Sequence, residues 1–154
     1  MSNILLEASD INTTPERLKE LAYKDTNLEL TRAVALNPSA PPDLLEALVY
    51  LEDEELRRNI ATNPNTPVDM LFELGAEFPR ELINNPIFPL LLLENPSLFL
   101  NMPFDTIASI LSLNDVPLSY LTMAVEDYED DQLLSIVANR IVRAAACGRN
   151  IGAL

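Results

Sequence analysis

The chain of 154 residues contains no histidine, no tryptophan, one cysteine and three glycines. Without histidine it lacks the commonest general base, the Ser–His and Cys–His nucleophile pairs, and the commonest ligand of transition metals. Cys147 alone cannot form an internal disulfide, a thiolate zinc site or an iron–sulfur cluster. We therefore expect a protein that is not an enzyme and that holds neither a metal nor a cofactor.

Basic residues are also scarce, since 10 Lys and Arg face 24 Asp and Glu, for a formal net charge of −14 at pH 7. Because phosphates are neutralised by clustered Lys and Arg, direct binding of DNA, RNA or an anionic membrane is disfavoured. The apolar stretch 82–104 is interrupted by four prolines, which argues against a membrane span. The first ten residues have neither a basic start nor an apolar run of signal-peptide length, so we expect a cytoplasmic protein.

What the chain does contain is an internal repeat. Pro15, Pro41 and Pro67 follow one another at intervals of 26 residues, and a shorter interval of 22 leads to Pro89. An arginine nine residues and an asparagine four residues before the later prolines extend the match. The asparagines are Asn37, Asn63 and Asn85, with a looser copy at Asn95, and the arginines are Arg32, Arg58 and Arg80. We call each copy a unit.

Each unit is predicted to consist of two helices. Proline suits the first helical position, and apolar residues recur at three- and four-residue spacing after Pro15, Pro41 and Pro67, which we call the marker prolines. The segments 28–35 and 56–61 are apolar-periodic for about two turns and then meet Asn-Pro, so each must end there, as a short α-helix or a 3-10 turn. With few glycines and no sustained alternation, strands are improbable. The fold class is therefore all-α.

Segment 34–48 begins Val-Ala-Leu-Asn-Pro-Ser-Ala-Pro-Pro-Asp, and segment 60–74 begins Ile-Ala-Thr-Asn-Pro-Asn-Thr-Pro-Val-Asp. Both segments resemble the leucine-rich repeat variant family. That resemblance implies a short right-handed superhelical solenoid of alternating α- and short or 3-10 helices, similar in kind to HEAT and armadillo arrays, and it leans bacterial. Some members carry a cysteine-rich N-terminal iron–sulfur domain, but residues 1–24 contain no cysteine. The cofactor is not carried over.

We expect residues 1–154 to form one repeat domain. Residues 1–24 are expected to hold an N-terminal cap and the first repeat helix, residues 25–111 the repeats, and residues 112–154 a degenerate repeat followed by a C-terminal capping helix over 132–147. Degenerate end units are typical of solenoids, because a terminal unit faces water on one side.

The two ladders of equivalent polar residues have different expected roles. The asparagines are expected to satisfy backbone groups where each short helix stops. The arginines could clamp a phosphate or a partner's carboxylates. Alternatively each could pair with an acid on its own helix, Arg32 with Glu29, Arg58 with Glu54 or Glu55, and Arg80 with Glu77.

Two acidic runs are further candidates for a binding surface. Such carboxylates could hold a cation or act as acid and base, although a calcium-loop pattern fails because Gln132 and Ala138 stand where glycine and glutamate are needed. They could equally be solvated loops. The candidate residues are Glu52, Asp53, Glu54 and Glu55 in the first run and Glu126, Asp127, Glu129, Asp130 and Asp131 in the second.

The most apolar stretch, Ile87–Phe104, contains four successive leucines, which occupy all sides of a helical turn. Some of them must meet a neighbouring unit, a partner or a second copy of the chain, so this stretch is a candidate homo-oligomer interface.

Together these features predict a non-enzymatic protein–protein interaction scaffold built from helical repeats, with the ladder arginines and the acidic runs on its binding surface. An alternative is an acidic inhibitor or immunity-type protein that blocks the basic, nucleic-acid-binding surface of its partner. A small enzyme using paired carboxylates is a third reading.

Overall fold

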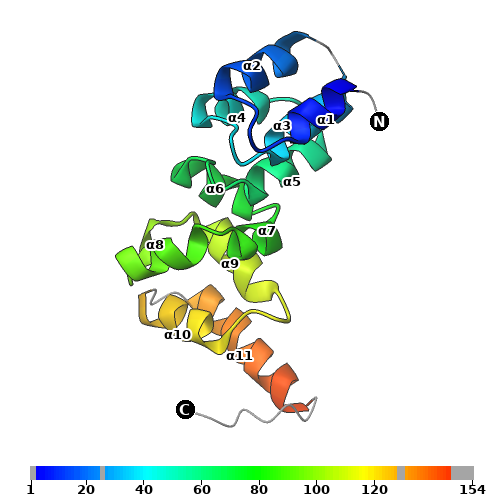
Figure 1. The fold of residues 1–154 in the computed structure, drawn as a ribbon. Helices are drawn as coiled ribbons and strands as arrows, with labels where there is room; N and C mark the ends of the chain where they lie inside the picture. The colour runs from blue at the N-terminus through cyan, green and yellow to red at the C-terminus, as the bar shows by residue number, and fades with distance from the viewer. Residues whose placement is uncertain (1–2, 25–26, 128–130, 147–154) are drawn as a thin grey trace.

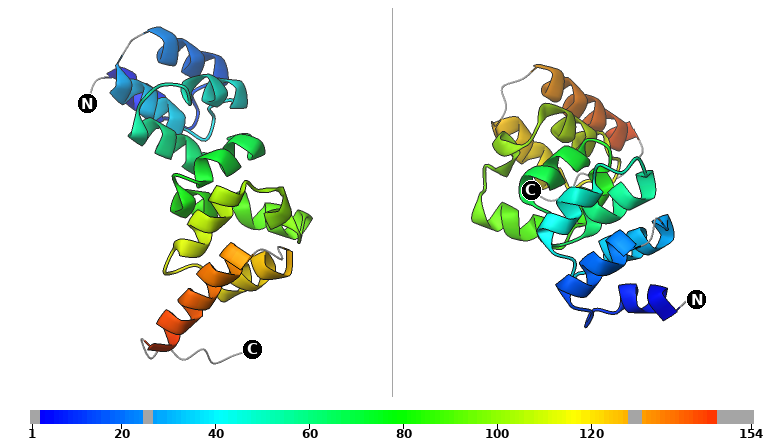
Figure 2. Two further views of the ribbon diagram at one scale, coloured as in Figure 1. Left: turned by 180° about the vertical axis from the view of Figure 1, so that it is seen from behind. Right: turned by 90° about the horizontal axis from the view of Figure 1, so that it is seen from above.

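The computed structural model describes residues 3–24, 27–127 and 131–146, and these residues form α-helices and one 3-10 helix with no strand. The all-α prediction is confirmed. The helices alternate between two layers of an elongated molecule (Figures 1 and 2). The first layer holds α2 (Pro15–Lys24), α4 (Pro42–Leu48), α6 (Val68–Gly75), α8 (Phe88–Glu94) and α10 (Leu118–Asp127).

The second layer is the continuous side of the array. It consists of α1 (Asn3–Ser9), α3 (Leu28–Leu36), α5 (Glu54–Thr62), α7 (Pro79–Asn84), α9 (Phe104–Ser112) and α11 (Asp131–Ala146). Each of these helices packs against the next one in that order. The 3-10 helix η1 (Leu98–Asn101) lies between α8 and α9 and contacts α10. The helix predicted over 132–147 is α11, within a residue at each end.

Proline and asparagine set the helix boundaries in the regular units. α2 and α4 begin at Pro15 and Pro42, and Pro67 is the N-cap of α6, because proline's fixed φ and missing N–H suit a helix start. The second-layer helices α3, α5 and α7 end at asparagines with extended backbone, since each is followed by proline. The segments 28–36 and 54–62 are α-helical, and the 3-10 alternative is realised among the described residues only in η1.

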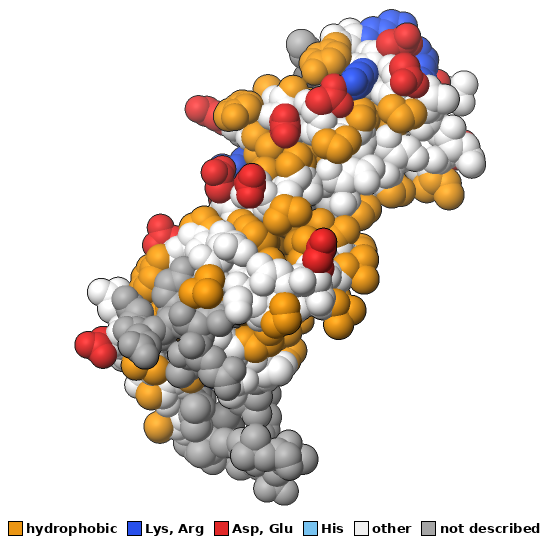
Figure 3. All heavy atoms as spheres, turned by 90° about the vertical axis from the view of Figure 1, so that its left-hand side faces the viewer, with side chains coloured by type: hydrophobic (Ala, Val, Ile, Leu, Met, Phe, Trp, Pro, Cys, Tyr) orange, Lys and Arg blue, Asp and Glu red, His pale blue; other side chains and the backbone are white. Residues whose placement is uncertain are grey.

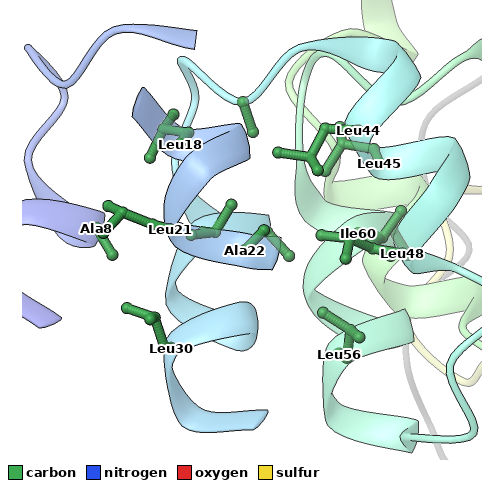
Figure 4. Close-up of a cluster of buried hydrophobic side chains, with 14 of the residues drawn as sticks. Ala8, Leu18, Leu21, Ala22, Leu30, Leu44, Leu45, Leu48, Leu56 and Ile60 are labelled. Carbon is green, nitrogen blue, oxygen red and sulfur yellow. The ribbon is translucent and has the colours of Figure 1, made fainter. Parts of the chain in front are cut away.

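Two clusters of buried side chains form the core. The first joins α1 to α5 and is drawn in Figure 4, where Leu18, Leu21 and Ala22 of α2 face Leu44, Leu45 and Leu48 of α4 and Ile60 of α5. The second runs from α6 to α11. α6 contributes to both, because Leu74 belongs to the first cluster whereas Leu71 and Phe72 belong to the second. This helix therefore couples the two halves of the array.

A glycine lets α6 approach α7 and α9 closely. A Cβ atom added to Gly75 would lie 2.3 Å from Cδ2 of Leu82 and 2.8 Å from Cγ2 of Thr106, distances that real Cβ contacts do not show. The hydroxyl of Thr106 donates to the main-chain oxygen of Phe72 at 2.6 Å, which holds α9 against α6. A side chain at position 75 would therefore fit only if Leu82 and Thr106 shifted.

None of the helices in the described ranges combines the length and the hydropathy that a bilayer-spanning segment needs.

Candidate functional site

The predicted asparagine ladder links successive units through buried side-chain amides. Nδ2 of Asn63 donates to the main-chain oxygens of Ala35 and Asn37, at 2.7 and 2.9 Å. Asn37 and Asn85 make the equivalent pairs of bonds to the unit before each of them. Each Oδ1 accepts from the backbone N–H two residues later. The structural role expected for these three asparagines is confirmed.

The ladder does not extend to Asn95. That side chain is half-buried and keeps only the local bond from the N–H of Ser97. Asn95 follows α8, a first-layer helix, whereas the three ladder asparagines follow second-layer helices. The looser sequence match at this position therefore reflects a turn motif and not a contact between units.

Near the C-terminal end, an arginine that the repeat pattern does not include donates to main-chain oxygens, as the ladder asparagines do. The guanidinium of Arg140 on α11 donates to the main-chain oxygens of Leu111 and Val116, at 3.3 and 3.2 Å. Burial lowers the pKa of Arg140, and the negative charge of Asp115 acts in the opposite direction, toward a higher pKa. Its signal in the sequence is the spacing from Leu133 and Val137, both buried, which puts position 140 on the face that meets α9.

The predicted arginine ladder is engaged in ion pairs between units. Arg32 binds both carboxylate oxygens of Asp53, at 2.8 and 2.5 Å, and also Glu55 at 2.6 Å. Arg80 pairs with Asp115 at 2.6 Å. The expected pairs Glu29–Arg32 and Glu77–Arg80 are not the ones formed. The second-layer helices lie side by side, and acids near the start of α5 reach Arg32 on α3, whereas Asp115 lies between α9 and α10.

Arg58 combines both kinds of pairing. It binds Glu54 on its own helix at 2.7 Å, as the sequence predicts, and its Nε lies 3.5 Å from Glu81 of α7. Its guanidinium carbon lies 5.5 Å from the centroid of the Phe78 ring, a cation–π contact. The neighbouring Arg57 pairs with Glu77. The ladder arginines thus hold the units together.

The first acidic run is largely used by the same contacts. Asp53 is the N-cap of α5, and it accepts from the backbone N–H of Leu56 at 2.8 Å. The bond from Arg32, with this backbone bond, lowers the pKa of Asp53. Glu54 and Glu55 pair with Arg58 and Arg32. Glu52 is exposed and has no ion pair in the described part of the chain.

The second acidic run falls partly outside the described residues. Glu129 and Asp130 lie outside them, as does Cys147. Glu126 and Asp127 are the last residues of α10, and their side chains are not described. Asp131 begins α11 and is exposed.

The apolar stretch Ile87–Phe104 is divided between core and surface. Four of its large side chains are buried in the second core cluster: Phe88, Leu98, Phe99 and Met102. Phe88 meets Tyr120 of α10 edge to face, with ring centroids 5.8 Å apart. Leu90, Leu93 and Leu100 are exposed. Packing within the chain therefore accounts for the aromatic residues and only some of the leucines.

A groove between α4 and α6 opens on the first-layer side of the molecule. Its volume is about 530 Å³. Its lining combines four carboxylates with four residues of apolar character: Asp43, Glu46, Asp69 and Glu73, and Ala47, Tyr50, Pro67 and Met70. Tyr50 is 84% exposed. Figure 3 shows this side of the molecule, where acidic side chains are scattered among apolar ones.

One of these carboxylates is neutralised and three are not. Nζ of Lys19 lies 2.5 Å from Oδ2 of Asp43, and this bond lowers the pKa of Asp43. Glu46, Asp69 and Glu73 have no ion pair with any described residue. Among the described residues, no group of three carboxylates is close enough together to hold a metal ion. The acidic charge of the groove is therefore spread along its walls.

Sequence analysis missed the groove, although part of its signal was present. Asp43 and Asp69 each stand two residues after a marker proline, so the repeat itself places one acid on each wall. Glu46 has a counterpart 26 residues earlier in Glu20, whereas Glu73 and Tyr50 do not recur at this interval. Their meeting depends on how α4 and α6 stack, which the sequence pattern does not specify.

Comparison with known proteins bears on the first half of the chain. Residues 3–61 match the family model of the Leucine Rich Repeat Variant domain. No curated protein and no solved structure matches the chain significantly. The matched range begins with α1 and ends within α5, so it includes Arg32, Asn37 and Arg58 but not Asn63, Arg80 or Asn85. The resemblance found in the sequence is thus confirmed for residues 3–61, which are similar to the Leucine Rich Repeat Variant domain.

Proposed function

We propose that the protein is a non-enzymatic interaction scaffold that binds a basic partner protein through its first-layer side. The repeat domain supports the general role, because stacked helical units create extended surfaces that serve mainly in binding. The single cysteine supports a reducing, cytoplasmic setting. The choice of partner and of side rests on how charge is divided between the two layers.

The division of charge between layers is the observation that carries the proposal. Beyond α2, every basic residue in a described helix lies on the second layer: Arg32, Arg57, Arg58, Arg80, Arg140 and Arg143. The first-layer helices α4, α6 and α8 carry five acids and no base: Asp43, Glu46, Asp69, Glu73 and Glu94. A surface with one sign of charge attracts a partner of the opposite sign and speeds their encounter.

The second layer is a poor candidate for the same task. The four arginines of α3, α5 and α7 all take part in ion pairs with acids of this chain, so those acids are already neutralised. A basic partner that bound Asp53 would have to displace Arg32 from a carboxylate that also caps α5. Breaking such a contact opposes binding, whereas the carboxylates of Glu46, Asp69 and Glu73 are available without it.

Affinity capture from the native lysate tests the proposal, with the tagged chain exposed to the lysate at low and at high salt. We expect a basic protein that is retained at low salt and released at high salt, because salt screens exposed charges. A partner that is retained equally at high salt would contradict a charge-driven scaffold and would favour the exposed leucines Leu90, Leu93 and Leu100 instead. Adding duplex DNA as competitor tests whether the partner surface is one that binds nucleic acid.

A further inference from the structure

We propose that the groove between α4 and α6 is the docking site for an extended segment of the partner that is rich in lysine or arginine, with one cationic side chain lying over Tyr50. The inference rests on the proposed function and names the part of the first layer that recognises the partner. Three features of the groove carry it: its apolar lining residues, the carboxylates that α4 and α6 contribute, and its exposed aromatic ring.

The acidic walls suit an elongated cation. Asp43 and Glu46 are three residues apart on α4, and Asp69 and Glu73 are four residues apart on α6. Residues at these spacings share a helix face, so each wall presents a short row of carboxylates. These rows do not converge on a point that could hold a metal ion, among the residues that the structure describes. Positive charges spaced along a peptide would meet both rows at once.

The exposed tyrosine suits the alkyl and cationic parts of the same segment. Tyr50 is 84% exposed although it is a large ring, and Met70 and Ala47 lie on the same lining. Lysine and arginine bury their carbon stems on apolar surface and place their charge over an aromatic ring. The chain contains one such contact already, that of Arg58 with Phe78. Tyr50 offers the same kind of ring to a partner.

The size of the groove limits the occupant. The groove is open to solvent, and its volume of about 530 Å³ accommodates a few side chains and not a folded domain. Lys19 already pairs with Asp43, one of the four lining carboxylates. The free charge of Glu46, Asp69 and Glu73 therefore decides which segment binds.

Fluorescence anisotropy with a labelled hexalysine peptide and the full chain at low salt tests the proposal. We expect the double variant Glu46→Gln/Glu73→Gln to weaken peptide binding by about fivefold, since two exposed ion pairs are lost. The matched control is Glu29→Gln/Glu52→Gln, which removes the same charge from exposed positions outside the groove. It should change binding by less than about twofold.

The aromatic contribution is tested separately. Tyr50→Ala should weaken binding by about threefold, whereas Tyr50→Phe, which keeps the ring, should leave it within about twofold of the wild type. Circular dichroism at the same temperature checks that each variant retains its helices. Both Tyr50 variants are on the surface, so their folding is not expected to change.

The outcomes separate the groove from the general function. If the two double variants weaken the peptide equally, the peptide responds only to net charge, and the groove is not the docking site even though a basic partner is still captured from the lysate. If Tyr50→Ala binds as the wild type does, the assigned cation–π contact is wrong. If hexalysine fails to bind at low salt and no basic protein is captured, the groove and the proposed function fail together.

Discussion

The side-chain amide of Asn63 lies 2.9 Å from the main-chain oxygen of Asn37, which stands 26 residues earlier at the equivalent place in the preceding unit. Asn85 repeats this contact with the main-chain oxygen of Asn63, at 3.1 Å. The same atom types therefore join three units in series. Because the contacts are equivalent, replacing one asparagine measures how much such a contact contributes to the free energy of unfolding.

Replacing Asn63 by alanine should destabilise the fold. The change removes two bonds to the preceding unit and the bond from the N–H of Asn65, and it leaves buried carbonyls without partners. We expect a loss of about 1–3 kcal/mol in the free energy of unfolding. Urea or thermal denaturation measures it. Asn95→Ala is the matched control, because Asn95 makes only the local turn bond, and an equal loss in the two variants would contradict a ladder between units.

Replacing Asp53 by asparagine should alter how stability depends on pH. Asparagine still caps a helix, so the change removes mainly the charge that faces Arg32. Because the pKa of Asp53 is lowered in the folded state, its ionised form contributes stability above the pKa of the unfolded chain, and this contribution is lost as the pH falls through the folded pKa. The difference in stability between wild type and variant should therefore be present at pH 7 and shrink on acidification.

Urea denaturation at a series of pH values measures this difference. Glu52→Gln serves as the control, since Glu52 neighbours Asp53 and has no ion pair in the described ranges. A difference between wild type and Asp53→Asn that stays constant down to the lowest pH would show that the charge of Asp53 does not stabilise the fold.

Replacing Arg140 by glutamine should loosen α11 from α9. Two main-chain oxygens, those of Leu111 and Val116, lose their donor. We expect a local cost of about 1–3 kcal/mol. Hydrogen exchange measures it. Exchange in α11 should be faster in the variant than in the wild type, whereas exchange in α3, at the other end of the array, should not change. Arg143→Gln, at an exposed position of the same helix, should leave exchange unchanged, and equal effects of the two substitutions would argue against the clamp.

Replacing Gly75 by alanine should destabilise the junction between the two core clusters. In an open helix this change raises stability, because alanine is the better helix former by about 1 kcal/mol. Here the new Cβ would collide with Leu82 and Thr106, so we expect a net loss of about 1–3 kcal/mol on thermal or urea unfolding. A stabilised variant would mean that α7 and α9 move aside at little cost.

The sequence predicted the units and the pair Glu54–Arg58, but not the ion pairs that form between units. The spacing of the prolines and asparagines defines where helices begin and end, since proline acts on its immediate neighbours. The pair Arg32–Asp53 spans 21 residues and depends on the stacking of α3 on α5. Periodicity within one helix favours Glu29 instead. The same limit explains the groove, whose Glu46 and Tyr50 acquire meaning only beside α6.

The direction of the asparagine bonds bears on how the chain folds while it is being made. Asn37, Asn63 and Asn85 each donate to carbonyls nearer the N-terminus. Every such bond uses only chain that has already left the ribosome when the asparagine emerges. Domains synthesised at a few residues per second have time to order from their N-terminal end. Each new unit can therefore form its asparagine hydrogen bonds to the preceding, already folded unit as soon as its own asparagine has emerged, before the rest of the array is synthesised.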